Sequence, residues 1–242
     1  MVSKREVKYI QSLSQKKHRL QERLFLVEGE KAVEELLLSN WQVRRIYASS
    51  EWMHTHDQVS VPVEEAGEEQ LQQMSGLQSA RSVLALVEMP DPCVVPAQPK
   101  GFTLVLDTVQ DPGNMGTLLR IADWFGIRQI MAGEHTADLY NPKVIQSSMG
   151  SFLRVQVSYT PLKNWLEQYQ SPIWGAVLDG PSVYEQASVE QAALIIGNEG
   201  HGIHPELLPF ITQPISIPRI GRAESLNAAV ATGILLSYLK RH

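Results

Sequence analysis

Apolar residues recur at helical spacing and in short runs through the first ninety residues, which divides this part of the chain into helices and strands. Val7, Ile10 and Leu13 predict an amphipathic helix from Glu6 to about Leu20. A second helix is predicted within GEKAVEELLLSNW and ends at Asn40. The other predicted elements are strands at 24–27, 43–49, 61–63 and 82–89 and a helix at 64–74. Strands that alternate with helices predict a small α/β unit.

A proline-rich segment, PDPCVVPAQPK, follows at 90–100, with prolines at 90, 92, 96 and 99. Proline lacks a backbone N–H and has a fixed φ, so no regular element is expected there. We therefore predict a first domain at 1–92, a linker at 93–100 and a second domain at 101–242.

Beyond the linker, strands and helices alternate in the order that is typical of a doubly wound, mostly parallel sheet. The predicted fold class is α/β. Strands are predicted at 103–107, 129–132, 154–157, 173–178, 193–196 and 214–217, and helices at 115–125, 142–149, 161–169 and 205–208.

The last two predicted strands each lead into a loop of glycine and small polar residues. Ligand crevices of open parallel sheets lie at such strand ends. The second loop continues into AESLNAAVATGILLSYL, which predicts a helix that starts at Glu224 or Ser225 and carries no charge until Lys240. A helix without charged residues on any face is expected to pack on both sides. A glycine-rich loop alone is weak evidence for a ligand, and the spacing here is not that of a dinucleotide fingerprint.

The composition is that of an ordinary globular protein, with no run of about 18 apolar residues that could span a membrane. The basic N-terminal segment lacks the apolar core of a secretory signal. A single cysteine, Cys93, forms no internal disulfide and indicates a reducing, cytoplasmic compartment. The net charge of −5 disfavours nucleic acid binding, but cations near the N-terminus could follow phosphates. These cations are Lys4, Arg5, Lys8, Lys16, Lys17, Arg19 and Arg23.

Metal-ligating residue types are present, but without the spacing of a metal site, so no metal is predicted. P-loop, nucleophile-elbow and zincin motifs are also missing from the sequence. These residues are His54, His56, Asp57, His201 and His204.

Four segments together resemble one family. GNEGHGI at 197–203 and IPRIGRAESLNAAVATGILL at 217–236 are similar to the second and third motifs of the SpoU/TrmH family of RNA 2'-O-ribose methyltransferases. LVLDTVQDPGNMGTLLRIADWFGI at 104–127 supplies the first motif, and NPKVIQSSMGS at 141–151 is a partial fourth match. The resemblance implies a SPOUT α/β knot, in which a C-terminal trefoil knot completes a mostly parallel sheet. Through FLVEGEKAVEELL, the N-terminal part resembles an L30e-like substrate-binding domain that precedes the methyltransferase domain in many members.

The resemblance also implies the site residues and S-adenosylmethionine as cofactor. The matching arginine, Arg120, is the proposed catalytic residue of the family. A free arginine is a poor base, so positioning of a phosphate and of the developing oxyanion is the safer assignment. The implied catalytic residues are Arg120, Asn114, Glu199, Ser225 and Asn227, and the implied cofactor-binding residues are Gly197, Ile217, Leu226, Ile196, Leu178 and Asn198.

Alternatives remain for several of these residues. Asn114 lies in the turn DPGNMG and could simply cap the following helix. Arg219, Arg222 and Lys143 could hold phosphates or be solvated surface residues.

The predicted function is a cytoplasmic, homodimeric, S-adenosylmethionine-dependent RNA 2'-O-ribose methyltransferase that acts on ribosomal RNA. The ribosomal preference rests on the additional N-terminal domain, and the dimer interface is expected on the last helix and the helix of Arg120. Methylation of tRNA is one alternative, and a catalytically silent RNA-binding or ribosome-assembly protein is another. The silent protein is disfavoured because all five polar motif residues are present. A small-molecule methyltransferase would leave the basic segment and the first domain without a purpose.

Overall fold

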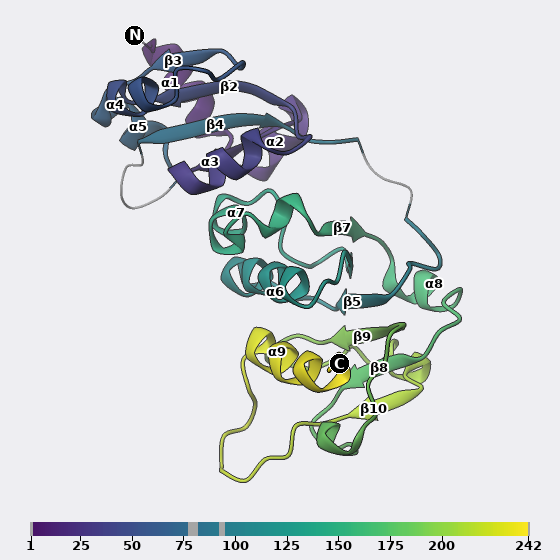
Figure 1. Ribbon diagram of the computed structural model, residues 1–242. Helices are drawn as coiled ribbons and strands as arrows, with labels where there is room; N and C mark the ends of the chain where they lie inside the picture. Colours follow the sequence, from purple (N-terminus) through teal and green to yellow (C-terminus); the bar gives the residue numbers. More distant parts are fainter. Residues whose placement is uncertain (1, 77–81, 92–94, 242) are drawn as a thin grey trace. The chain divides into compact units, whose positions relative to one another are not determined.

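The computed structural model describes residues 2–76, 82–91 and 95–241 (Figure 1). Two compact units are present, and each is described by itself. Unit 1 comprises residues 1–92 and 138–153, and unit 2 comprises residues 93–137 and 154–242. The domain boundaries predicted at 92/93 and 100/101 stay predictions, and residues 92–94 lie outside the described residues.

Unit 1 contains a four-stranded sheet in the order β1-β4-β2-β3. β4 pairs antiparallel with both β1 and β2, whereas β3 pairs parallel with β2. The strands are β1 (Leu24–Glu28), β2 (Val43–Ala48), β3 (Val63–Glu65) and β4 (Val83–Glu88). The helices are α1 (Lys4–Ser12), α2 (Lys16–Glu22), α3 (Glu30–Leu37), α4 (Ser50–Thr55), α5 (Glu68–Met74) and α7 (Pro142–Ser148).

The single helix predicted at 6–20 is wrong, because the chain forms two helices with a turn between them. Arg19 of α2 is only 2% exposed and donates through Nη1 to the carbonyls of Leu13 (2.9 Å) and Ser14 (2.7 Å). These contacts satisfy carbonyls at the end of α1 that the broken helix leaves unpaired. Arg19 also forms an ion pair with Asp138 (2.5 Å), so it does not belong to the exposed basic residues near the N-terminus.

An aromatic cluster attaches residues 138–153 to the sheet of unit 1. The ring of Phe25, on β1, lies 4.8 Å from that of Tyr140 and 6.1 Å from that of Phe152, between ring centroids. Trp41 completes the cluster with edge-to-face contacts to both phenylalanines. Offset and edge-to-face pairs of this kind add to the stabilisation that burial alone provides.

Unit 2 contains a six-stranded sheet in the order β10-β8-β9-β5-β6-β7, and every pairing in it is parallel. This confirms the α/β class and the parallel sheet. The strands are β5 (Phe102–Leu106), β6 (Gln129–Ala132), β7 (Gln156–Tyr159), β8 (Ile173–Ala176), β9 (Ala192–Ile196) and β10 (Gln213–Ile215). The helices are α6 (Pro112–Trp124), α8 (Leu162–Leu166) and α9 (Ala228–Leu239).

Both faces of the central strands are covered, since every residue of β5 and β9 is buried. Alternate side chains of these strands, among them Val105 and Ile195, pack with α8 and with the segment 203–207. Helices α6 and α9 contact each other and lie together in Figure 1. Continuous apolar strands are the expected pattern for a parallel sheet that is covered on two sides.

Three details of unit 2 differ from the prediction. The cap of α9 is Asn227, not Glu224 or Ser225, and its Oδ1 accepts from the N–H groups of Ala229 and Val230. A helix at 205–208 does not form, and a 3₁₀ turn lies at Leu208–Phe210 instead. α9 is not covered on all sides, because Val230 is 52% exposed and Ser237 is exposed. None of the helices in the described ranges is long and apolar enough to cross a membrane.

Candidate functional site

The residues predicted to bind the cofactor gather at one edge of the sheet in unit 2. Strands β10, β8 and β9 are neighbours and run parallel, so their carboxyl ends lie side by side. Ile196 ends β9, Leu178 follows β8 by two residues, and Ile217 follows β10 by two residues. The structure therefore places at one sheet edge residues that are up to 39 positions apart in the chain.

The loop after β9 folds back on itself. The N–H of Asn198 donates to the carbonyl of Gly202, and the N–H of Gly202 donates to the carbonyl of Asn198, both at 2.9 Å. A Cβ on Gly197 would lie 2.2 Å from the carbonyl carbon of Gly202, so the return of the chain leaves room for glycine only. The side-chain Oδ1 of Asn198 accepts from the N–H of Gly200 (2.8 Å), which closes the turn from inside.

A chain of hydrogen bonds joins one residue from each of the three motifs. Nδ2 of Asn114 donates to Oε1 of Glu199 at 2.6 Å. Nδ2 of Asn227 donates to Oδ1 of Asn114 at 2.9 Å. The amide of Asn114 thus bridges a carboxylate of the loop after β9 and the residue that caps α9.

The alternative in which Asn114 caps α6 is wrong. The cap of α6 is Asp111, whose carboxylate accepts from the N–H of Asn114 at 2.8 Å. Pro112 occupies the first position of the helix, where its missing N–H costs no hydrogen bond. The Asp-Pro pair was the sequence signal for this helix start, and it leaves the side chain of Asn114 available for the bridge.

Arg120 lies on the exposed surface of α6, six residues after Asn114. Within the described residues, its guanidinium makes no hydrogen bond or ion pair. A cation that has no partner in the protein can bind an anionic ligand without first breaking an internal contact. The structure does not bring Arg120 into the hydrogen-bonded chain of the three motifs.

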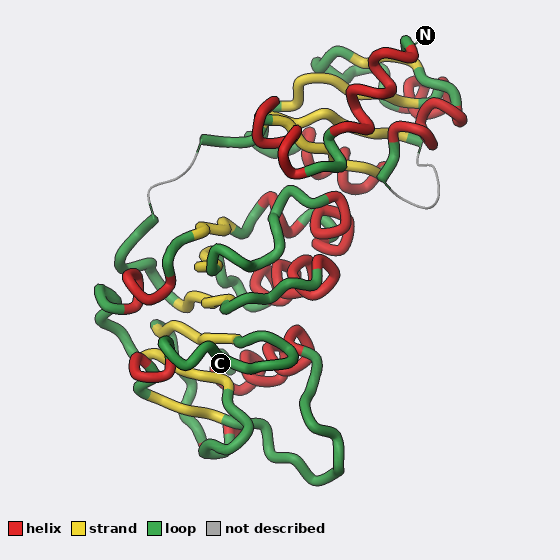
Figure 2. Tube along the Cα trace, turned by 180° about the vertical axis from the view of Figure 1, so that it is seen from behind, coloured by secondary structure: helices red, strands yellow, loops and turns green. Residues whose placement is uncertain are grey.

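The loop between β10 and α9 projects away from the sheet, and the two views agree on this (Figures 1 and 2). All residues from Pro218 to Asn227 are exposed, and Ile220 is fully exposed. Ser225 and Leu226 belong to this loop, and Ser225 has no hydrogen bond in the part of the chain that is described. Arg219 donates to the carbonyl of Ala223 (3.3 Å). The structure thus places Ser225 near Asn227 in sequence but outside the network.

The residues at the sheet edge fit S-adenosylmethionine by their chemistry. Leu178 is 71% exposed and Leu226 is 47% exposed, although both are large apolar side chains. An adenine ring could cover such side chains, and ligand sites commonly combine apolar walls with a few polar groups. The carboxylate of Glu199 is suited to a cationic ligand. Gly197, Asn198, Ile196 and Ile217 supply backbone groups at the strand ends.

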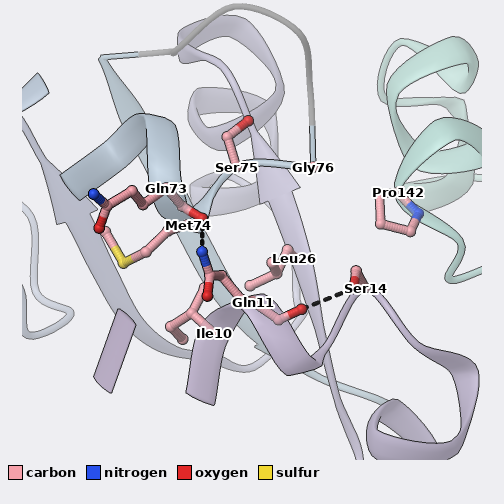
Figure 3. Close-up of a pocket in the computed structure, with 9 residues that line it drawn as sticks. All are labelled: Ile10, Gln11, Ser14, Leu26, Gln73, Met74, Ser75, Gly76 and Pro142. Carbon is pink, nitrogen blue, oxygen red and sulfur yellow. Dashed lines mark hydrogen bonds between the residues drawn. The ribbon is translucent and has the colours of Figure 1, made fainter. Parts of the chain in front are cut away.

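A different cavity lies in unit 1 and contains none of the predicted site residues. It has a volume of about 190 Å³. Figure 3 shows the residues that line it, among which Gln11 donates through Nε2 to the carbonyl of Gln73 (2.8 Å). No group of three or more potential metal ligands occurs among the described residues. The cavity is lined by Ile10, Gln11, Ser14, Leu26, Gln73, Met74, Ser75, Gly76 and Pro142.

Comparison with known proteins adds independent information. Residues 101–237 match the SpoU rRNA Methylase family, and residues 4–85 match the MRM3-like substrate binding domain. Over 240 residues the chain is 32% identical to the 23S rRNA (guanosine(2553)-2'-O)-methyltransferase RlmP of Bacillus subtilis (strain 168), which covers 97% of this chain and 96% of the relative.

Solved structures agree over the whole chain. A TrmH-family structure from Porphyromonas gingivalis has a TM-score of 0.87 at 38% identity and covers 99% of this chain and 98% of its own. An AdoMet-bound rRNA methyltransferase from Sinorhizobium meliloti has a TM-score of 0.87 at 28% identity and covers 100% of this chain and 97% of its own. The family match spans more than half of the chain and includes all three loops that meet around Asn114, and the chain therefore belongs to the SpoU rRNA Methylase family.

Proposed function

We propose that this protein transfers a methyl group from S-adenosylmethionine to a ribose 2'-hydroxyl of 23S rRNA. The observation that carries the proposal is the chain Glu199–Asn114–Asn227, which joins the three motif loops at one edge of a parallel sheet. The names of relatives that match most of this chain favour ribosomal RNA over tRNA. The match of residues 4–85 to a substrate-binding domain supports the same choice.

Methyl transfer would form a bond from the ribose 2'-oxygen to the methyl carbon and break the bond from that carbon to the sulfonium sulfur. S-adenosylhomocysteine would leave, and the hydroxyl proton would pass to solvent. When bound, S-adenosylmethionine supplies the electrophilic methyl group. The guanidinium of Arg120 would hold an RNA phosphate and favour the negative charge that develops on the 2'-oxygen. Because Arg120 has no partner among the described residues, its charge is available for this task.

The other motif residues prepare the site. The carboxylate of Glu199 would attract the cationic ligand. Asn114 would hold that carboxylate in one orientation, and Asn227 would in turn hold the amide of Asn114. Backbone groups of the loop after β9 and the exposed side chains of Leu178 and Leu226 would bind the adenosyl part, together with Ile196, Gly197, Asn198 and Ile217. Ser225 would join the site through the loop before α9.

The deciding experiment measures transfer of labelled methyl from S-adenosylmethionine to rRNA and tRNA, each prepared from cells that lack this protein. We expect label in 23S rRNA and, after digestion, in a 2'-O-methyl nucleoside. Label in tRNA would support the proposed methyl transfer but refute 23S rRNA as the substrate. Cofactor binding without transfer to naked rRNA, to precursor ribosomal particles or to tRNA would favour the silent RNA-binding protein.

Four finer features belong to the proposal. The C-terminal segment would form a trefoil knot, supported by contacts at both ends of α9: Asn227 with Asn114, and the carbonyl of Leu239 with the N–H of Val189. The first domain would be L30e-like, supported by its four-stranded sheet with helices. The compartment would be the cytoplasm, supported by the rRNA methyltransferase names of its relatives.

The fourth feature is a homodimer. Trp124 of α6 is 87% exposed and Val230 of α9 is 52% exposed, and these two helices pack against each other. Large exposed apolar side chains on adjoining helices are typical of an interface. Sedimentation velocity at micromolar concentration should give a dimer, and Trp124→Glu should shift the protein to a monomer. A wild-type monomer would refute the dimer without affecting the proposed reaction.

A further inference from the structure

Two consecutive residues at the end of β5 contact both ends of the loop after β9. Oδ2 of Asp107 accepts from the N–H of His204 at 2.6 Å. The carbonyl of Thr108 accepts from Nδ2 of Asn198 at 2.9 Å. The loop therefore leaves β9 against Thr108 and ends against Asp107, although about 90 residues of chain separate the two segments.

The backbone of Thr108 is in an unusual conformation. Its φ is 55°, in the left-handed region that β-branched residues rarely adopt. The adjoining Asp107 still belongs to the sheet, because its N–H donates to the carbonyl of Ile196 at 2.9 Å. The reversal at Thr108 turns its carbonyl toward Asn198 directly after the last sheet contact. Strain of this kind persists where the surrounding structure determines it, and it is concentrated at functional sites.

The carboxylate of Asp107 is nearly inaccessible, since the residue is 5% exposed. A buried carboxylate must accept hydrogen bonds to offset its lost hydration. Its partner is a backbone N–H, so the contact depends on the path of the loop and not on a particular side chain of His204. The same loop carries Glu199, which receives the hydrogen bond from Asn114. Any opening of the loop at His204 would release the constraint on Glu199.

We propose that Asp107 and the left-handed turn at Thr108 form a clamp that positions the loop 197–204 for cofactor binding and methyl transfer. Both are positioning residues, because they act through the loop and not on the substrate. The inference rests on the proposed methyltransferase function, and it gives a role to two residues of the segment 104–127 that had none in the predicted site.

The test compares Asp107→Ala with Asp107→Asn, which keeps an oxygen acceptor for the N–H of His204. The control is Thr136→Val, which removes another buried hydrogen bond at the same strand end, from Oγ1 of Thr136 to the carbonyl of Leu106 (3.0 Å). S-adenosylmethionine affinity is measured by calorimetry, turnover by methyl transfer, and loop opening by amide hydrogen exchange over 198–206. Thermal unfolding is recorded for all variants.

We expect Asp107→Ala to weaken S-adenosylmethionine binding about 10- to 100-fold, because a hydrogen bond to a buried carboxylate is lost. Exchange at 198–206 should accelerate by a similar factor. Asp107→Asn should stay within about threefold of wild type, and Thr136→Val should lose thermal stability without changing the affinity. Thr108→Pro should weaken binding and accelerate exchange as Asp107→Ala does, because the proline ring fixes φ at about −65° and so forbids the left-handed turn.

Unchanged affinity and exchange in Asp107→Ala would overturn the clamp. An equal loss of affinity in Thr136→Val would also overturn it, since a general loss of stability would then explain the result. Wild-type affinity and exchange in Thr108→Pro would refute the turn as part of the clamp. A wild-type protein that binds S-adenosylmethionine but methylates no RNA would refute the proposed function, while affinity and exchange would still decide on the clamp.

Discussion

The bridge between Glu199 and Asn114 allows a test in which charge changes while shape is conserved. Asn114→Asp replaces an amide by a carboxylate of the same size. Nδ2 of Asn114, which now donates to Oε1 of Glu199 at 2.6 Å, is lost, and a second negative charge takes its place. Oδ1 of the new carboxylate can still accept from Nδ2 of Asn227.

Two effects add at this half-buried position. Loss of a hydrogen bond to a charged acceptor costs about 1.5–3 kcal/mol. Two carboxylates about 4 Å apart repel by at most about 4 kcal/mol at an effective dielectric constant of about 20. Rotation of the side chains and uptake of a proton relieve part of this repulsion. We expect the unfolding free energy of Asn114→Asp to be ~2–4 kcal/mol below that of wild type at pH 7.

The sign of the pH dependence follows from the repulsion. Neighbouring carboxylates raise the pKa of one member of the pair, so the folded variant binds a proton more readily than the unfolded chain. The difference in unfolding free energy between wild type and Asn114→Asp should therefore shrink as the pH falls from about 7 toward about 5. Urea unfolding of wild type and variant at several pH values measures this directly.

A double variant separates structure from chemistry. With Glu199→Gln added to Asn114→Asp, the new amide at position 199 can donate to the new carboxylate at position 114. Stability should return to within about 1 kcal/mol of wild type. Turnover should stay low, because the negative charge has moved from the loop after β9 to α6. Some activity can remain in the double variant, but turnover at the wild-type value would contradict the prediction.

One result would show that the hydrogen bond between Asn114 and Glu199 does not support the site. If Asn114→Asp has the stability and the turnover of wild type at pH 7, the two side chains do not interact in solution. A deficit that does not change with pH would refute the electrostatic part alone.

Three further predictions concern Arg120, Gly197 and Tyr47. Arg120→Ala should lower the single-turnover rate of methyl transfer at least about 100-fold. Its unfolding free energy should stay within about 0.5 kcal/mol of wild type, because the side chain has no partner in the described structure. The exposed control Arg128→Ala should retain activity. Gly197→Ala should abolish cofactor binding in calorimetry because its Cβ would lie 2.2 Å from backbone, while Gly221→Ala, which meets no atom within 4 Å, should bind normally. Burial and a hydrogen bond to a carboxylate raise the pKa of Tyr47 above its ordinary value of 10.0. The unfolded chain therefore loses the tyrosine proton at a lower pH than the folded protein does. The unfolding free energy should fall above about pH 10, by up to ~1.4 kcal/mol per pH unit. Urea unfolding between about pH 9 and pH 11, where tyrosine titrates, should show a smaller decline in unfolding free energy for Tyr47→Phe than for wild type. An identical decline in both proteins would contradict the raised pKa of Tyr47.

Local sequence patterns determined much of this protein. The apolar runs of β5 and β9 predicted buried parallel strands because both of their faces need covering, and the motifs around Asn114, Glu199 and Asn227 predicted the family that the comparisons confirm. Most element positions could be predicted for the same reason, since periodicity records which face of an element is buried. The break between α1 and α2 could not be predicted, because the side chain of a buried arginine satisfies carbonyls of that turn, and apolar periodicity does not record such a contact.

Only the tertiary structure decided which polar groups meet. Asn114 could have capped α6, but Asp111 does so, and the amide joins two loops that are 85 and 113 residues away in sequence. The contacts of Asp107 and Thr108 with the loop after β9 were equally invisible, because the strand order and a left-handed backbone create them. Periodicity depends on neighbours along the chain, whereas these hydrogen bonds depend on which strand ends lie side by side in the sheet.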